Sequence, residues 1–302
     1  MAMVTLALLA SIAWPETSEA AFVRANCRGI QKFSDSQPRV KCSESSVLED
    51  DRHLMLGHTR AEASLADARL TSSATGGQIR GVGANGGDAG AVLMDRLTIT
   101  GDWQGDVEVT VRLCVAYTFA GFGESRVNAE LHSYSGSAVT YANQARVRIL
   151  HRGFGGATLE DVESRGAITT PEPGPRPAQS VFELSVTERV QRSNPVLTLR
   201  ADLASYALPN LESLEPVLSS FAEATARLVV SLPSSLDFSS QSGVFPRAVS
   251  SGESARSTPS SDPSWGIIAA SDIGSGHALR DHRRRHRAVA RSDCRQQLGV
   301  DG

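Results

Sequence analysis

Three carboxylates stand close together near the middle of the chain: Glu160, Asp161 and Glu163 follow the glycine-rich turn Gly153-Phe154-Gly155-Gly156. Two carboxyl groups held about 5 to 9 Å apart can hydrolyse a glycosidic bond between them. That chemistry also needs a cleft that positions both groups, and nothing in the sequence fixes one here. We therefore interpret the three carboxylates as part of a solvated acidic loop, and the sequence predicts no catalytic residue.

The other residues that could bind a ligand are scattered. His132 and His151 lie at the ends of expected strands, where we interpret them as hydrogen-bonded or solvated side chains. Asp88, with Asn85 nearby, could give oxygen ligands to a structural Ca²⁺, but no further ligand is evident. The chain contains no GxSxG, HExxH or paired Cys-His motif. The sequence therefore predicts no bound metal ion and no cofactor.

Residues 81–86 read GVGANG, a literal GxGxxG. A dinucleotide site needs a strand directly before this motif and a helix directly after it. Here Gly87-Asp88-Ala89-Gly90 and a strand-like run follow. We interpret residues 76–90 as a flexible glycine-rich loop and not as a nucleotide site.

Four cysteines are spaced unevenly along the chain. Cys27 and Cys42 lie close together in a polar segment that has little else to hold it, and closing a loop of this size contributes about 3 kcal/mol in the chain-entropy description. Neither has the spacing of a zinc site. The sequence thus predicts a disulfide between Cys27 and Cys42. We expect Cys114 to be a small buried apolar residue and Cys294 to carry a free thiol.

The N-terminus indicates the compartment. Residues 3–14 form an apolar run that is too short to cross a bilayer, and Ser18-Glu19-Ala20 is a small-x-small cleavage site. We therefore expect a signal peptide over residues 1–20, removed after Ala20, and a secreted or cell-surface protein with no transmembrane span. No Lys or Arg precedes the apolar run, so either the true start lies upstream or the signal is atypical. The alternative to a signal peptide is a buried N-terminal strand or helix.

In the middle of the chain apolar and polar residues alternate with a period of two, which is typical of β-strands. The pattern predicts strands at residues 91–100, 106–119, 126–134, 138–150, 181–186, 196–203, 221–232 and 236–245, and a strand pair at 59–71 that turns near Ala66-Asp67. No crossover helix separates these strands. The fold expected is all-β, an antiparallel jelly-roll-like β-sandwich with disordered N-terminal and C-terminal extensions.

Composition divides the chain into four parts: residues 1–20, an irregular segment at 21–57, the sandwich at 58–246, and a Ser-, Pro- and Arg-rich tail at 247–302. The tail has too few apolar residues to offset the entropy of ordering it, so we expect it to be disordered. Residues 280–295 hold seven Arg against two Asp, although the whole chain has a net charge of −3. This basic cluster could meet phosphates or anionic lipid, but a solvated end is favoured, and no nucleic-acid partner is expected.

Four stretches carry a resemblance to a known family: ASLADARL at 63–70, DRLTI at 95–99, VVSLP at 229–233 and FSSQSGVF at 238–245. Through these stretches, residues 58–246 resemble bacterial exported β-sandwich proteins of the PEP-CTERM type, the substrates of exosortase sorting. The resemblance implies a non-catalytic sandwich outside the cell.

The C-terminus departs from that family, whose members end in Pro-Glu-Pro, a spanning apolar helix and an arginine cluster. Here Arg283-Arg284-Arg285 is present, but Asp272, His277 and Asp281 interrupt any span before it. Pro171-Glu172-Pro173 matches the tripeptide but a strand follows it. The sorting signal is therefore not expected to work here.

The function expected is that of a non-catalytic envelope, surface or extracellular-matrix protein whose partner is unknown. The alternative is a carbohydrate-binding module or an accessory domain of a glycan-active system, with an extracellular polysaccharide as its partner. Aromatic side chains aligned on one sheet face would favour the alternative. Trp103 lies in a turn and Tyr117, Tyr134 and Tyr141 lie in strands, but the sequence does not show whether they share a face.

Overall fold

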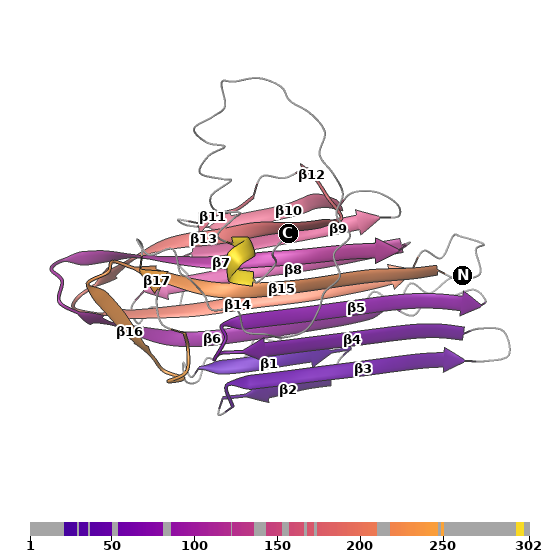
Figure 1. Cartoon of the computed structure of the whole chain (residues 1–302), viewed down its shortest axis with the longest axis horizontal. Coiled ribbons are helices and arrows are strands. Elements are labelled where there is room, and N and C mark those ends of the chain that lie inside the picture. The colour runs from indigo at the N-terminus through magenta and orange to yellow at the C-terminus, as the bar shows by residue number, and fades with distance from the viewer. Residues whose placement is uncertain are drawn as a thin grey trace, which may run out of the picture.

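A computed structural model describes residues 21–28, 30–35, 37–49, 54–80, 86–121, 123–135, 143–152, 157–165, 168–171, 174–209, 218–246, 249–250 and 294–298. Nearly all of these residues lie in long strands that form two sheets packed face to face (Figure 1). The predicted antiparallel β-sandwich is therefore confirmed, with more strands than the pattern indicated.

Sheet A holds nine of the strands. In spatial order they are β12 (Gly174–Arg176), β10 (Ala157–Arg165), β9 (Asn143–Arg152), β8 (Gly123–Ser135), β14 (Val196–Pro209), β6 (Gly87–Gly101), β1 (Phe22–Cys27) and β2 (Ile30–Ser34), and β16 (Leu236–Ser240) also pairs with β6. β1 and β16 pair with successive parts of the same edge of β6.

Sheet B holds eight strands. In order they are β11 (Ile168–Thr169), β13 (Gln179–Gln191), β7 (Asp106–Gly121), β15 (Leu218–Leu232), β5 (Arg69–Arg80), β4 (Leu54–Ser64) and β3 (Arg39–Glu49), and β17 (Val249–Ser250) pairs with β15. The β15–β17 pair is parallel and spans two residues. The other described pairs are antiparallel.

The core lies between the two sheets, where β14 of sheet A packs against β5 and β15 of sheet B. Alternate residues of each strand point inward, as Val109, Val111 and Leu113 do on β7, and these are fully buried. Much of the opposing surface consists of alanine, so the sheets pack closely with few aromatic residues between them.

The N-terminal segment differs from our expectation. Residues 21–57 were predicted to be irregular, but they form β1, β2, β3 and the first part of β4. Val23, Ala25 and Cys27 alternate into the core, and so do Val40 and Cys42. The segment supplies one edge strand to each sheet, β2 to sheet A and β3 to sheet B.

The strand pair predicted at residues 59–71 is confirmed as the β4–β5 hairpin. Its turn runs from Leu65 to Ala68, and Ala68 takes a left-handed backbone with φ of 48°. The carbonyl oxygen of Ala68 accepts a hydrogen bond of 2.8 Å from the backbone N–H of Leu228, which ties the turn to β15.

The proline-rich segment after residue 173 contains a short strand. β12 forms there and pairs with β10 at the edge of sheet A. Proline is tolerated at an edge because one side of the strand needs no ladder hydrogen bond.

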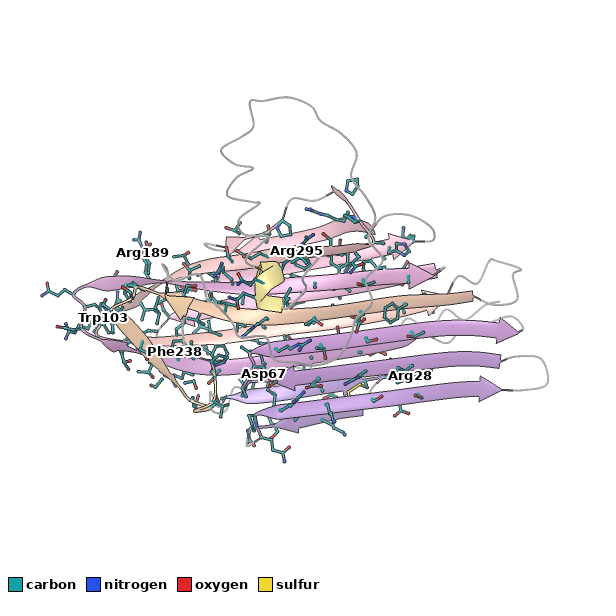
Figure 2. All side chains as sticks on the ribbon, viewed as in Figure 1. Arg28, Asp67, Trp103, Arg189, Phe238 and Arg295 are labelled. Carbon is teal, nitrogen blue, oxygen red and sulfur yellow. A yellow bond between two sulfur atoms is a disulfide. The ribbon has the colours of Figure 1, made fainter. Side chains whose placement is uncertain are left out.

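The segment after β16 closes one side of the sandwich around a buried carboxylate. Asp95 of β6 is fully buried and accepts hydrogen bonds from the Ser242 hydroxyl, 2.5 Å, and from the backbone N–H groups of Ser242 and Arg96. Burial raises the pKa of Asp95, and these hydrogen bonds offset part of that rise. Phe245 packs into the core beside Phe238, which is labelled in Figure 2.

Candidate functional site

The acidic trio lies on β10 and not in a loop. A β-bulge between Leu159 and Asp161 shifts the register there, and Glu163 pairs in register with Arg146 of β9. Glu163 is exposed, and the side chains of Glu160 and Asp161 lie outside the described part of the structure. The interpretation as an acidic loop was therefore wrong about the element.

The densest polar cluster among the described residues lies on the outer face of sheet A, and we call it the charged face. It consists of Arg24 on β1, Glu130 and His132 on β8, Arg146 on β9, and Arg200 and Asp202 on β14. These side chains share a face because neighbouring strands pair Asp202 with Glu130, Glu130 with Arg146, and Arg200 with His132.

Side chains on the charged face bind one another. The guanidinium of Arg200 binds Asp202 through two hydrogen bonds, Nε to Oδ2 at 2.8 Å and Nη2 to Oδ1 at 2.9 Å. Glu130 Oε1 lies 3.3 Å from Arg146 Nε, and its other oxygen, Oε2, lies 3.3 Å from His132 Nε2. Both carboxylates thus have cationic partners in the plane of the sheet.

Partial burial and mutual charge set the ionisation on this face. Burial alone would raise the pKa of Glu130, but the hydrogen bond with His132 and the charges of His132, Arg146 and Arg200 outweigh it, so the pKa lies below its usual value. Burial lowers the pKa of Arg24, with Asp202 opposing the shift and Arg200 adding to it. The face is a network of opposite charges, not a set of groups that converge on a pocket.

A second polar cluster lies inside the sandwich. Glu188 of β13 points into the core with 5% of its surface exposed. Its Oε1 atom accepts a hydrogen bond of 2.6 Å from the Ser133 hydroxyl and another from the Asn143 side-chain amide. These bonds join β13 of sheet B to β8 and β9 of sheet A. Their geometry suits a structural contact, because a buried carboxylate needs such donors.

The two histidines singled out in the sequence have different surroundings. His151 is buried in the core, where its ring stacks on Phe119 with centroids 5.6 Å apart and an interplanar angle of 14°. His132, also buried, belongs to the charged face. Asp88 lies on β6, which directly follows the GVGANG segment, so that motif leads into a strand and not a helix. Asn85 lies outside the described residues.

The described tyrosines do not form a platform for sugar rings. Tyr117 is buried in the core, and its hydroxyl donates to the carbonyl oxygen of Pro177 at 3.1 Å. Tyr134 and Tyr206 lie on the outer face of sheet A, but they sit at opposite ends of β14 in the register. Tyr134 is buried, and Arg126 covers the Tyr206 ring at 5.5 Å. Tyr141 lies outside the described residues.

All four cysteines are in disulfides. Cys27 bonds to Cys42, as predicted, and joins β1 of sheet A to β3 of sheet B. Cys114 is buried, as expected, but it bonds to Cys294, so the expectation that Cys294 carries a free thiol was wrong. Sequence spacing gave no signal for a pair that is 180 residues apart.

The second disulfide also corrects the prediction of a wholly disordered tail. Residues 294–298 form a short helix against the outer face of sheet B, in front of β7 and β15 in Figure 1. Leu298 packs near Cys114 and Val181, and the Arg227 guanidinium donates to the carbonyl oxygen of Gln297 at 2.8 Å. Arg295, labelled in Figure 2, lies on this helix. In the described residues no helix is long and apolar enough to cross a membrane.

The sequence pattern held a signal for the charged face that we did not use. Glu130-Leu131-His132 and Arg200-Ala201-Asp202 each place two titratable side chains two residues apart, on one face of a strand. The pattern could not show that the two strands are neighbours, since β14 follows β8 by about 60 residues of chain.

Comparisons with known proteins add little. No family model matches the sequence, and no curated protein is similar to it. One similar solved structure is described as "Pore forming protein"; it is 7% identical, has a TM-score of 0.13, and the match covers 70% of this chain and 91% of that one. A likeness at this level carries no argument about fold or function.

Proposed function

We propose that the protein is a non-catalytic, exported β-sandwich that serves in the envelope, on the cell surface or in the extracellular matrix. The observation that carries this proposal is the pairing of all four cysteines. Disulfides persist in oxidising compartments and are rare where thiols are kept reduced. An expected signal peptide over residues 1–20 and the resemblance to exported sandwich proteins support the same compartment.

The absence of catalysis is argued from how the charges are arranged. An active site needs titratable groups that converge on a substrate in a pocket. On the charged face, Glu130 and Asp202 are bound by Arg146, His132 and Arg200 instead. Glu188 is enclosed in the core and bound by Ser133 and Asn143. The aromatic placement gives no specific support to carbohydrate binding, so that alternative is not proposed.

Export is tested by producing the full chain in a bacterial host with a general secretory pathway. We expect the mature protein outside the cytoplasm, with an N-terminus at Ala21 by N-terminal sequencing. A Leu8→Arg variant should stay in the cytoplasm as the uncleaved chain, because a charge in the apolar run blocks recognition as a signal. Cytoplasmic accumulation of the unaltered chain with residues 1–20 still attached would contradict the proposal.

Catalysis is tested on common polysaccharides and ester substrates with the purified oxidised protein. We expect no turnover above that of a heat-unfolded sample. Hydrolysis that disappears in Glu160→Ala, Asp161→Ala or Glu163→Ala would make β10 the site of an enzyme and would defeat the non-catalytic assignment. The exposed Glu108→Ala on sheet B is the matched control for nonspecific loss.

A further inference from the structure

Three potential metal ligands of different kinds meet on the charged face. A carboxylate oxygen of Glu130, an imidazole nitrogen of His132 and a carboxylate oxygen of Asp202 all lie within 4.8 Å of one another. They come from two hydrogen-bonded neighbours, β8 and β14, where Asp202 pairs with Glu130 in register. Two paired strands hold such side chains more rigidly than loops can.

The spacing of two of the atoms suits a metal ion between them as well as it suits the hydrogen bond described above. His132 Nε2 and Glu130 Oε2 are 3.3 Å apart, whereas a charge-assisted hydrogen bond is usually about 2.7 to 2.9 Å long. Two ligand atoms that each lie about 2 Å from a tetrahedral Zn²⁺ are about 3.3 Å apart. The Asp202 oxygen lies within 4.8 Å of both atoms, so it has to approach by at most about 1.5 Å to complete such a set.

We propose that Glu130, His132 and Asp202 bind one first-row divalent transition-metal ion, of which Zn²⁺ is the type. The proposal is independent of the function proposed above. Imidazole with carboxylate is a donor set that suits Zn²⁺, with water in the remaining positions. His132 is nearly buried, with 6% of its surface exposed.

The arginines decide which ion the site takes. Arg200 and Arg146 neutralise much of the charge on Asp202 and Glu130, which disfavours Ca²⁺ and Mg²⁺, because these ions depend on carboxylate charge. The imidazole nitrogen contributes more to the binding of Zn²⁺ than to the binding of Ca²⁺ or Mg²⁺. Each carboxylate oxygen has two lone pairs, so a hydrogen bond from arginine leaves one for the metal and holds the oxygen in place.

The other cluster with metal-ligating atoms is not a site of this kind. Cys114, Glu183 and Cys294 also lie close together, but both sulfur atoms are already in a disulfide. Oxidised sulfur does not act as the thiolate that binds zinc.

The test uses the full chain, oxidised, without an affinity tag and freed of metal with a chelator. Isothermal titration with Zn²⁺ should show one ion bound per chain. His132→Ala should weaken that binding by at least about tenfold, whereas His58→Ala, which removes an exposed histidine on sheet B, should leave it unchanged. Absence of Zn²⁺ binding overturns the proposal. Zn²⁺ binding that His132→Ala does not weaken also overturns it, because the ion is then bound elsewhere, for example by the histidines of residues 277–286.

Two further measurements keep the result decisive. If His132→Ala does not fold, Glu130→Gln decides in its place: weaker Zn²⁺ binding supports the site, and unchanged binding overturns it. Titration with Ca²⁺ should give binding at least about tenfold weaker than with Zn²⁺. Equal affinity for the two ions would show a site governed by carboxylate charge and would overturn the assignment of the imidazole as a ligand.

Discussion

Arg28 carries a backbone strain that a substitution can relieve. It lies in the turn between β1 and β2 with φ of 46°, in the left-handed region that most residues avoid. Asn tolerates this region, and Asn followed by Gly is the favoured pair for a two-residue hairpin turn. Gly29 is the next residue here.

We predict that Arg28→Asn raises the free energy of unfolding by about 0.5 to 1 kcal/mol, as measured by chemical denaturation. Arg69→Asn removes an exposed arginine from a strand and should give no such gain. Equal or lower stability of Arg28→Asn would mean that the arginine's attraction to Asp88 outweighs the strain.

Glu130 should make stability depend on pH. Its pKa is lowered from the ordinary value of 4.5, so the folded state holds its carboxylate ionised where the unfolded state takes up a proton. The stabilisation is therefore fully present above pH 4.5 and is lost as the pH falls through the lowered pKa. We expect Glu130→Gln to be less stable than the unaltered protein at pH 7, with a difference that shrinks towards pH 3.

That comparison is made by urea denaturation at several pH values, in metal-free buffer. Glu108→Gln removes a carboxylate whose ion pair with Arg189 is exposed, so it should have little effect at any pH. A constant difference between Glu130→Gln and the unaltered protein across the range would show that the lost interaction is not electrostatic.

At the scale of strands, the two lysines of the chain have a shared position. Lys32 lies on β2 and Lys41 on β3, the strands that form the open edges of sheets A and B on the same side of the sandwich. Both are exposed, and the 28 other basic residues of the chain are arginines. Lysine on an edge strand opposes pairing with the edge of another molecule.

The double variant Lys32→Val/Lys41→Val should therefore self-associate. We expect the apparent mass in sedimentation velocity to rise with protein concentration, while the unaltered protein stays at one mass. Arg60→Val/Arg69→Val makes the same change of charge and apolarity on β4 and β5, which are paired on both sides. Association of that control to the same extent would show that general loss of charge, and not the open edge, is responsible.

Strands with unbroken alternation could be predicted from the sequence, and those at the edges could not. β7 alternates valine and leucine with polar residues over its whole length, so its limits were nearly right. β3 reads RVKCSESSVLE, where serine and glutamate on both faces hide the alternation of Val40 and Cys42. An edge strand needs fewer apolar residues, because it contacts less of the core.

The candidate site could also be predicted only in part from the sequence, for a different reason. A period of two places Glu130 beside His132 and Arg200 beside Asp202 on the surface of their strands. Bringing the two pairs together depends on β14 inserting between β8 and β6, which only the packing of the whole sandwich decides. Glu188 is different: it lies between Val186 and Val190 at alternate positions, so the pattern placed it inward, and only its partners Ser133 and Asn143 could not be predicted.

For the whole molecule, the two disulfides close loops of very different size. Cys27 and Cys42 are 15 residues apart and Cys114 and Cys294 are 180 apart. In the chain-entropy description the long loop contributes about 5 kcal/mol and the short one about 3 kcal/mol, because the unfolded chain loses more freedom when distant residues are joined.

We predict that Cys114→Ser/Cys294→Ser lowers the free energy of unfolding more than Cys27→Ser/Cys42→Ser does. Guanidinium denaturation of both double variants measures the difference, with the fully oxidised protein as reference. Removal of residues 247–302 should lower the free energy of unfolding at least as much as the Cys114→Ser/Cys294→Ser change, because it also removes the partner of Cys114. A larger loss from the Cys27–Cys42 pair would mean that joining the two sheets matters more than loop length.

The order in which the cysteines pair has a consequence for biogenesis. Four cysteines can pair in three ways, and this chain joins the first to the second and the third to the fourth. In a chain that crosses a membrane from its N-terminus, each cysteine meets the oxidant in that same order. An oxidase that links each new thiol to the one waiting before it therefore produces the native bonds directly. Maturation should need no disulfide isomerase, although the Cys114 thiol has to wait while 180 residues emerge.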